Sequence, residues 1–175
     1  MRIGLATNEQ TEQVVLLLAE LNAHYNPNSP APREVVREHL VNNLLSSASQ
    51  RLVVAAGDSG NVVGLAAIML VCSIVEPEPD RRLQCQLKEL YVSKPFRGTG
   101  TCKALMHWVA SYAAAHGCSR IDWHVKSGNA SGIAFYKRLG ASVVEDRLSF
   151  RLNQSSLTAL AGSARSVASQ ETPSK

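Results

Sequence analysis

The chain has 175 residues, of which 45% are apolar and 18% charged, and its formal net charge at pH 7 is +4. This length suffices for one domain with a buried core, and the composition is ordinary for a soluble globular protein. The sequence has no block of Lys and Arg typical of nucleic-acid binders, and no apolar run of about eighteen residues that would span a membrane. These features argue against nucleic-acid and membrane partners.

The N-terminus and the cysteines indicate in which cellular compartment the protein is located. The first residues, MRIGLATNEQTEQ, lack the apolar core of a signal peptide, which predicts a cytoplasmic protein. Cys72, Cys85, Cys102 and Cys118 form no C-x-x-C pair and have no histidine nearby at ligand spacing. Free buried thiols are therefore predicted, rather than a zinc site or a disulfide framework. A nucleophilic Cys102 at a helix N-terminus is a second interpretation, ranked below packing because the sequence shows no partner for it.

The first third of the chain predicts one strand and two helices. Residues 2–6 form a short strand, and Thr7 is a good N-cap for a helix that ends near Asn26. The Pro-rich loop that follows leads to a second helix over residues 33–45.

Two apolar runs then predict an antiparallel hairpin. Residues 52–56 and 62–73 are joined by the turn-rich sequence GDSGN. The stretch 76–82, EPEPDRR, cannot be regular sheet. Its carboxylates either attract a cationic amine or belong to a solvated surface loop.

Residues 87–116 predict a strand, a tight loop and a helix. Pro95 ends the strand close to Ser93, and Gly98 and Gly100 allow a sharp turn and close approach of a ligand. Apolar residues then recur at helical spacing up to Gly117, a C-terminal cap. Free N–H groups at the helix N-terminus, with the helix dipole, favour a phosphate ligand.

The last third predicts a strand, a helix and a final hairpin, over residues 120–125, 129–139, 141–145 and 148–152. From Gly162 the sequence is Ser-rich and poor in apolar residues. We therefore predict a single domain over residues 1–161 and a disordered tail over 162–175.

The residues of the loop do not match either of two common nucleotide-binding motifs. No Walker A sequence is present, and the dinucleotide pattern G-x-G-x-x-G meets Lys103 at its third glycine. The string Arg97-x-x-Gly100-x-Cys102 instead resembles the pyrophosphate loop of the GCN5-related N-acetyltransferases (GNAT), Gln/Arg-x-x-Gly-x-Gly/Ala, and departs from it at Cys102. On the loop alone, an ordinary glycine turn between a strand and a helix remains an alternative.

A second stretch strengthens the resemblance. Residues 129–141, NASGIAFYKRLGA, are similar to the helix that follows the loop in this family, and the spacing of the two stretches also fits. The similarity covers most of residues 52–152. Within the family, FYKRLGAS followed by RLSFRL looks most like the diamine (spermidine/spermine-type) acetyltransferase branch.

The resemblance implies a fold, a cosubstrate and an assembly. It predicts an α/β GNAT fold, with a mixed, mostly antiparallel sheet splayed around acetyl-CoA and flanked by helices, and a homodimer formed through the last strands. The residues implied in cofactor binding are Leu90, Tyr91, Val92, Arg97, Gly98, Thr99, Gly100, Thr101, Cys102, Lys103, Asn129 and Tyr136. Backbone N–H groups of the first three would hold the acetyl carbonyl and the pantetheine arm, and the loop residues would hold the pyrophosphate.

Acetyl transfer also needs a proton acceptor, because an alkyl amine has a pKa of about 10.4. The diamine branch has a Glu-Asp pair in its central strand, and Lys88 and Glu89 stand at those positions here. We therefore predict Glu89 as the base, acting directly or through water, with a structural ion pair as the alternative. The resemblance also predicts Tyr136 as the general acid for the leaving thiolate, with packing of the helix as the alternative.

The sequence thus predicts an acetyl-CoA-dependent N-acetyltransferase acting on a small primary amine, whether a diamine or polyamine, an amino acid or a xenobiotic amine. By the resemblance His24 and Tyr25 lie on the acceptor side, where they contact substrate or form a solvated helix end. The alternatives are a non-catalytic acyl-CoA-binding module, an acetyltransferase for a protein amine and, less favoured, a nucleotide-phosphate binder.

Overall fold

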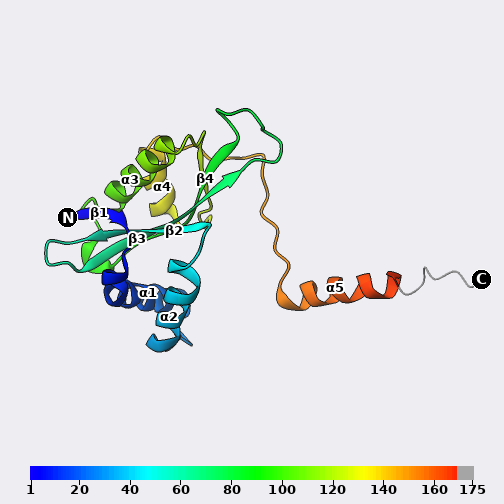
Figure 1. Cartoon of the computed structure of the whole chain (residues 1–175), viewed down its shortest axis with the longest axis horizontal. Helices are drawn as coiled ribbons and strands as arrows, with labels where there is room; N and C mark the ends of the chain where they lie inside the picture. The colour runs from blue at the N-terminus through cyan, green and yellow to red at the C-terminus, as the bar shows by residue number, and fades with distance from the viewer. Residues whose placement is uncertain (169–175) are drawn as a thin grey trace, which may run out of the picture. The chain divides into compact units, whose positions relative to one another are not determined.

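A computed structural model describes residues 1–168 of the chain, which divide between Phe135 and Tyr136 into two compact units. Within the described residues, the strands form one five-stranded sheet in the order β1 (Arg2–Leu5), β2 (Gln50–Ala56), β3 (Val62–Cys72), β4 (Leu83–Val92) and β5 (Ile121–Trp123). Strands β1 to β4 are antiparallel and β5 is parallel to β4 (Figure 1). The predicted mixed, mostly antiparallel sheet is confirmed.

Helices cover both faces of this sheet. On one face lie α1 (Thr11–Tyr25), α2 (Arg33–His39) and the π-helical turn η2 (Leu40–Leu45), and on the other lies α3 (Thr101–Ala115) (Figure 1). Short 3-10 turns, η1 (Asn8–Gln10) and η3 (Lys94–Phe96), precede α1 and α3. The single helix predicted over residues 33–45 is thus an α-helix that widens into a π-helical turn.

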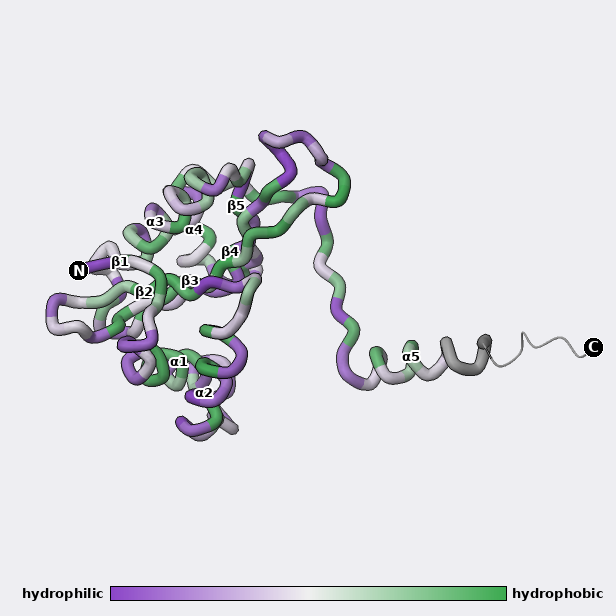
Figure 2. The backbone as a smooth tube through the Cα atoms, viewed as in Figure 1, coloured by the Kyte–Doolittle hydropathy of each residue, from purple (hydrophilic) through white to green (hydrophobic). Residues whose placement is uncertain are grey.

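The core on the α1 face follows from the alternation of the strands. Residues opposite one another on adjacent strands point to the same face, and here they are apolar: Leu52, Val54, Val62, Leu65, Ala67 and Tyr91. The helices bury Val14, Leu17, Leu21, Val36 and Leu40 against them. Figure 2 shows the resulting contrast between mainly hydrophobic strands and the hydrophilic stretch 76–82.

On the other face, α3 approaches the sheet closely at a glycine. A Cβ on Gly64 would lie 3.0 Å from Val92 Cγ2 and 3.2 Å from Leu105 Cδ1. Leu105 is fully buried. The absence of a side chain at Gly64 therefore lets α3 pack directly over β3 and the end of β4.

Helix α4 (Ala130–Arg138) begins in the first unit and ends in the second, which also contains α5 (Gln154–Ala168). The predicted hairpin over 141–145 and 148–152 is wrong for this structure, because no residue from 141 to 153 is in a strand. The alternating pattern of RLSFRL suits a strand, but a strand also needs a paired backbone, which this segment does not have among the described residues. Helix α5 runs past residue 161, where the sequence predicts disorder to begin; residues 169–175 lie outside the described part, and the boundary at 161 stays a prediction.

Candidate functional site

The sheet opens between β4 and β5. In the described chain β5 pairs with β4 only from Cys85 to Leu87, whereas β4 continues to Val92. The N–H of Ser93 donates to the Val63 carbonyl on β3 at 3.0 Å. Because backbone groups alternate along a strand, the N–H groups of Leu90 and Val92 turn away from β3, toward the open side. Of the three predicted backbone positions, these two face the opening.

The side chain of the third position, Tyr91, belongs to the core. Tyr91 is 6% exposed and its hydroxyl donates to Glu20 Oε1 at 2.9 Å. Glu20 also accepts the backbone N–H of Lys94 at 3.3 Å. This contact fixes the end of β4 to α1 just before the glycine loop begins.

A β-bulge decides where Glu89 points. Glu89 stands opposite Ala67 on β3, and Leu87 stands opposite Ile68, so Lys88 is the extra, unpaired residue. The bulge places Glu89 on the same face as Ala67 and Tyr91, which is the face covered by α1. Simple alternation continued from Leu87 would have put Glu89 on the α3 face.

This placement brings Glu89 to the end of α1. The hydroxyl of Tyr25, the last residue of α1, donates to Glu89 Oε1 at 3.2 Å. Burial raises the pKa of Glu89, although the Tyr25 hydroxyl, the Leu90 N–H and the charges of His24 and Lys126 oppose that shift. Burial and the neighbouring carboxylate also raise the pKa of Tyr25, so its hydroxyl keeps its proton. A carboxylate with a raised pKa is a stronger base near neutral pH.

Glu89 forms no ion pair with any described residue, and its role as the base stays a prediction. It lies among aromatic side chains. The ring of His24 lies 5.3 Å from that of Tyr25 and 6.2 Å from that of Tyr91. Lys126 Nζ lies 5.2 Å from the centre of the Tyr25 ring. His24 and Tyr25, predicted as either substrate contacts or a solvated helix end, are thus gathered at Glu89.

Lys126 was missed from the sequence. It lies in the loop between β5 and α4, and nothing in its neighbours along the chain indicates a site. Only the fold brings it to the end of α1, about a hundred residues earlier in the chain.

The glycine loop combines three features that suit an anion. Gly98 and Gly100 have φ of 78° and 86°, and a Cβ on either would meet no atom within 4 Å. Gly100 is the N-cap of α3, and no side chain caps that end. The first bond of the helix runs from the Ala104 N–H to the Gly100 carbonyl at 3.0 Å, so the N–H groups of Thr101 to Lys103 precede it. Open space, free amides and the helix dipole coincide here, which suits a phosphate.

Side chains of the loop stabilise it through hydrogen bonds to the backbone and to one another. Arg97 Nε donates to the Val92 carbonyl at 3.0 Å, which joins the loop to the end of β4. Thr99 Oγ1 lies 2.7 Å from the Phe96 carbonyl and 2.9 Å from Thr101 Oγ1. Lys103 is exposed. The remaining guanidinium N–H groups of Arg97 and the Lys103 ammonium supply the positive charge.

Cys102 does not have the features of a nucleophile. Burial raises the pKa of its thiol, and the opposing influence of Arg97 does not reverse the shift. The packing interpretation of Cys102 fits this environment, because a nucleophilic cysteine needs a lowered pKa.

Asn129 and Tyr136 lie at the two ends of α4. Asn129 Oδ1 accepts the Gly132 N–H at 3.0 Å and Ser131 Oγ at 3.1 Å, so it caps the helix. The Tyr136 carbonyl accepts the N–H groups of Leu139 and Ala141 at 3.0 and 3.1 Å and so closes the other end. The cofactor contact of Asn129 and the acid role of Tyr136 stay predictions.

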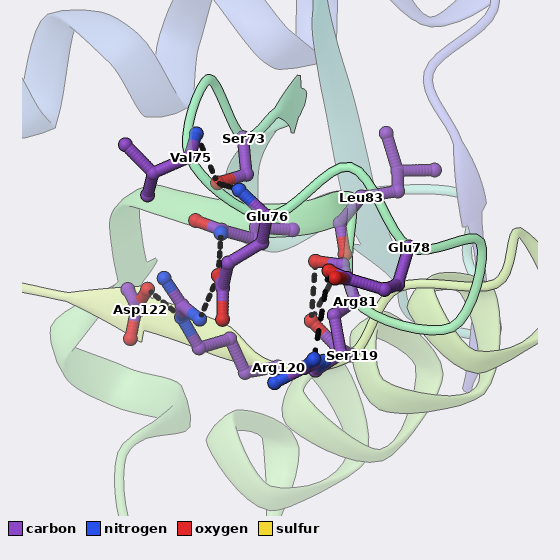
Figure 3. A network of polar contacts seen from close by, with 10 residues as sticks. Ser73, Val75, Glu76, Glu78, Arg81, Leu83, Ser119, Arg120 and Asp122 are labelled. Atoms are coloured by element: carbon purple, nitrogen blue, oxygen red, sulfur yellow. Dashed lines mark hydrogen bonds and ion pairs between the residues drawn. The ribbon is translucent and has the colours of Figure 1, made fainter.

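Two of the three carboxylates in the acidic stretch after β3 are already paired with arginines. Glu76 Oε2 accepts Arg120 Nη1 at 3.0 Å and Gln84 Nε2 at 3.1 Å, and Glu78 pairs with Arg81 at 3.5 Å (Figure 3). Ser119 Oγ adds bonds to the carbonyls of Arg81 and Leu83 at 3.3 and 3.2 Å. These contacts fold the stretch against the start of β5, which favours the surface-loop interpretation.

Other features of the described residues add no second site. Two surface hollows of about 320 and 430 Å³ are lined by β1 and its neighbours, and none of the candidate site residues lines them. No group of three metal-binding side chains gathers in the described part. Nor does that part contain a helix with the length and apolarity needed to cross a membrane.

Residues 17–141 match the model of the acetyltransferase (GNAT) family. The chain belongs to the GNAT family. The predicted class of enzyme, an acyltransferase, and the predicted GNAT fold are confirmed at that level.

Two relatives of the chain are both named as N-acetyltransferases. An uncharacterized N-acetyltransferase of Mycobacterium bovis is 31% identical over 132 residues, which cover 69% of this chain and 78% of that protein. The L-ornithine N5-acetyltransferase of Arabidopsis thaliana is 31% identical over 74 residues, 42% of this chain and only 32% of that protein. The diamine branch is not among these matches, so the narrower prediction is unconfirmed.

Solved structures match most of the chain. An integron cassette protein of V. cholerae has a TM-score of 0.81 and 27% identity, with 91% of this chain and 96% of that chain covered. The ribosomal-protein-alanine N-acetyltransferase of Brucella melitensis biovar Abortus, with a TM-score of 0.69 and 22% identity, covers 87% of this chain and 100% of its own. At that identity the second match bears on the fold alone.

Proposed function

We propose that the protein is an acetyl-CoA-dependent N-acetyltransferase that acetylates a primary amine of a small molecule. The observation that carries the proposal is the half-buried Glu89, held by the Tyr25 hydroxyl at 3.2 Å on the strand whose far edge is open. A carboxylate with a raised pKa beside an open strand edge and an anion-binding loop is what amine acetylation requires.

The steps of transfer can be assigned to residues of the chain. Glu89 accepts the proton of the substrate ammonium, and the neutral amine attacks the thioester carbonyl carbon. The backbone N–H of Val92 donates to the carbonyl oxygen as it becomes negative, whereas the Leu90 N–H already supports the Glu89 carboxylate. As the C–S bond breaks, Tyr136 gives its proton to the leaving sulfur, in the role that the family resemblance implies. The attacking nitrogen then loses its extra proton through water to the Tyr136 oxygen, which leaves the neutral amide and restores the phenol, while Glu89 releases its proton to solvent.

The loop fits the cosubstrate by its chemistry. The pyrophosphate of acetyl-CoA would lie over Gly98 and Gly100, against the N–H groups at the start of α3, with Arg97 and Lys103 supplying charge. Cys102, which departs from the family pattern, lies partly buried in the first turn of α3. The hydrogen bonds described for the loop do not involve the Cys102 side chain.

A small-molecule acceptor is supported by one relative. The Arabidopsis protein is named for acetylation of L-ornithine, an amino acid with a primary side-chain amine. Because its match spans less than a third of its length, it supports the class of acceptor rather than the identity. Four free cysteines in the described chain fit a reducing compartment, and we place the enzyme in the cytoplasm.

We also propose that the protein is a homodimer that pairs through residues 148–152. In the single chain, Leu148 is 83% and Phe150 90% exposed, and Leu152 is exposed as well. Alternating large apolar residues on an unpaired extended segment are a common element of strand-mediated association. A molar mass of one chain, about 18.9 kDa, in light scattering at micromolar concentration would contradict this assembly.

The direct test is release of free thiol from acetyl-CoA over a panel of amines, with CoA affinity measured separately by calorimetry. The panel comprises spermidine, putrescine, thialysine, lysine, ornithine and an aminoglycoside. Turnover with one class establishes the function and names the acceptor. Tight CoA binding without turnover on any amine would contradict it and favour the non-catalytic acyl-CoA-binding module.

Tyr136→Phe tests the acid within the same assay. Because the phenol acts on the leaving sulfur, the variant should lose most of its turnover, by a factor of about a hundred, while acetyl-CoA affinity stays unchanged. Equal turnover in the variant would remove Tyr136 from the mechanism.

A further inference from the structure

Three side chains from distant parts of the chain meet at the proposed base. Tyr25 contacts two charged groups: its hydroxyl donates to Glu89 at 3.2 Å, and the ammonium of Lys126 lies 5.2 Å from the centre of its ring. Tyr25 is 48% exposed, so solvent reaches this group. An acceptor whose amine reaches Glu89 therefore comes close to a fixed positive charge.

The cations around Glu89 are not neutralised by the protein. Lys126 forms no ion pair with any described residue, and neither does Lys88, the exposed residue of the bulge next to Glu89. His24 lies on the same side, and its charge also favours ionised Glu89. The carboxylate of Glu89 thus lies near one unpaired lysine, Lys126, and near His24.

This arrangement disfavours binding of a polycationic acceptor. Its first amine would use Glu89, and its second ammonium would face Lys126 with no carboxylate to hold it. Of the carboxylates in the loop after β3, Glu76 and Glu78 are already paired with arginines, at the other end of β4 (Figure 3). An acceptor with an anionic group would instead pair with Lys126.

We propose that the acceptor is an amino-acid-type amine, whose carboxylate binds Lys126 while its side-chain amine is directed to Glu89. The proposal rests on the acetyltransferase function proposed above and narrows its acceptor. Lys126 determines specificity here, and Tyr25 is a positioning residue that holds the amine site and the carboxylate site at a fixed separation.

The test compares acceptors that differ only by the carboxylate. L-Ornithine is paired with putrescine, and L-lysine with cadaverine, and kcat/KM is measured for each with saturating acetyl-CoA. The wild-type protein should prefer the carboxylate-bearing member of at least one pair by about tenfold or more. Lys126→Gln should bring the ratio close to one, mainly through KM of the amino acid, and Lys126→Glu should bring it below one.

A merely structural role of Lys126 predicts something different. If Lys126 only steadied the Tyr25 ring, its loss would lower kcat/KM for both members of a pair and leave their ratio unchanged, which overturns the proposal. Arg82→Gln is the matched control, because it removes one exposed positive charge from the loop before β4, away from the proposed site. It should leave the ratio at the wild-type value.

The outcomes also distinguish this inference from the acetyltransferase function on which it rests. Turnover of putrescine and cadaverine at equal or better efficiency by the wild-type protein would overturn the inference and keep the acetyltransferase. Turnover of no amine would overturn both.

Discussion

Two glutamates on one side of the sheet show how the same side chain is used for structure and for chemistry. Glu76 meets Arg120 at 3.0 Å and Gln84 at 3.1 Å, and the pair ties the loop after β3 to the strand β5. Glu89 has no cation in contact among the described residues and is held by the neutral hydroxyl of Tyr25. Burial outweighs that bond and raises the Glu89 pKa.

The difference lies in what each carboxylate is free to do. A carboxylate bonded to arginine is fixed as an anion and is a weak proton acceptor. A half-buried carboxylate that is bonded only to a hydroxyl and a backbone N–H is relieved of its desolvation cost when it accepts a proton. Glu76, which the fold pairs with arginine, therefore has a structural role. Glu89, which has no ion pair among the described residues, is the carboxylate available to a substrate amine.

The largest expected effect separates these two glutamates directly. Glu89→Gln keeps the shape of the side chain and removes the base, so kcat/KM for the amine should fall by about a hundredfold to ten-thousandfold. Acetyl-CoA affinity, measured by calorimetry, should not change. Glu76→Gln is the matched control: it should keep the activity and lower the free energy of unfolding by about 1 kcal/mol or less, as for a partly exposed ion pair. Equal activity of the two variants would contradict the comparison.

The glycine loop offers the next largest effect. Gly100 has φ of 86°, and Gly60, in the turn between β2 and β3, has φ of 82°, and a Cβ on either meets no atom within 4 Å. Gly100→Val and Gly60→Val should therefore lose similar free energies of unfolding, roughly 1–2 kcal/mol or more, from the same backbone strain. Only Gly100→Val should lose measurable CoA binding, because its side chain would lie in the proposed path of the pyrophosphate. Normal CoA affinity in that variant would remove the loop from the site.

How much of this was predictable depends on whether the cause is local. Gly98 and Gly100 could be predicted because a tight turn between a strand and a helix requires positive φ, and both have it. The strand β4 could be predicted from its apolar residues and its end from Pro95. The predicted final hairpin is wrong because the alternating apolar and polar residues of RLSFRL specify which side chains share a face, but they do not supply a partner strand.

The geometry of the base could not be predicted for a similar reason. Whether Glu89 faces α1 depends on the bulge at Lys88, which arises from the register with β3 rather than from the residues of β4. The contacts of Glu89 with Tyr25, and of Tyr25 with Lys126, join residues far apart in the sequence. The residue types were visible in the sequence, but their meeting point was not.

The hydroxyl of Tyr25 gives a smaller effect with a defined sign. Its bond favours ionised Glu89, so removing it should raise the Glu89 pKa further. In Tyr25→Phe the acid limb of the pH profile of kcat/KM should therefore move to higher pH. Tyr112→Phe, on α3 and stacked on Trp108 at 5.0 Å, should leave the limb in place. An acid limb that stays or moves to lower pH in Tyr25→Phe would show that this hydroxyl does not act on the base.

The smallest effect concerns stability and has opposite signs at two glutamates on the α1 face. The pKa of Glu89 is raised, so below the pKa of the unfolded chain both states hold the proton, and stability falls as pH rises through the folded-state pKa. Glu89→Gln should therefore be more stable than wild type at pH 8, with the gain shrinking toward pH 4. Burial acts on Glu20 in the same direction, but hydrogen bonds from Ser93, Tyr91 and the Lys94 N–H outweigh it and lower its pKa.

Glu20 therefore stabilises the fold above its unfolded pKa, and that contribution is lost as pH falls through the folded-state pKa. Glu20→Gln should be less stable than wild type at pH 8, with the deficit shrinking toward pH 4. Both differences should lie within the roughly 0.5–3 kcal/mol usual for single substitutions, and thermal unfolding at the two pH values measures them. If both variants lost stability at pH 8, the Glu89 carboxylate would be contributing to the fold as Glu20 does, and its burial would no longer mark it as the base.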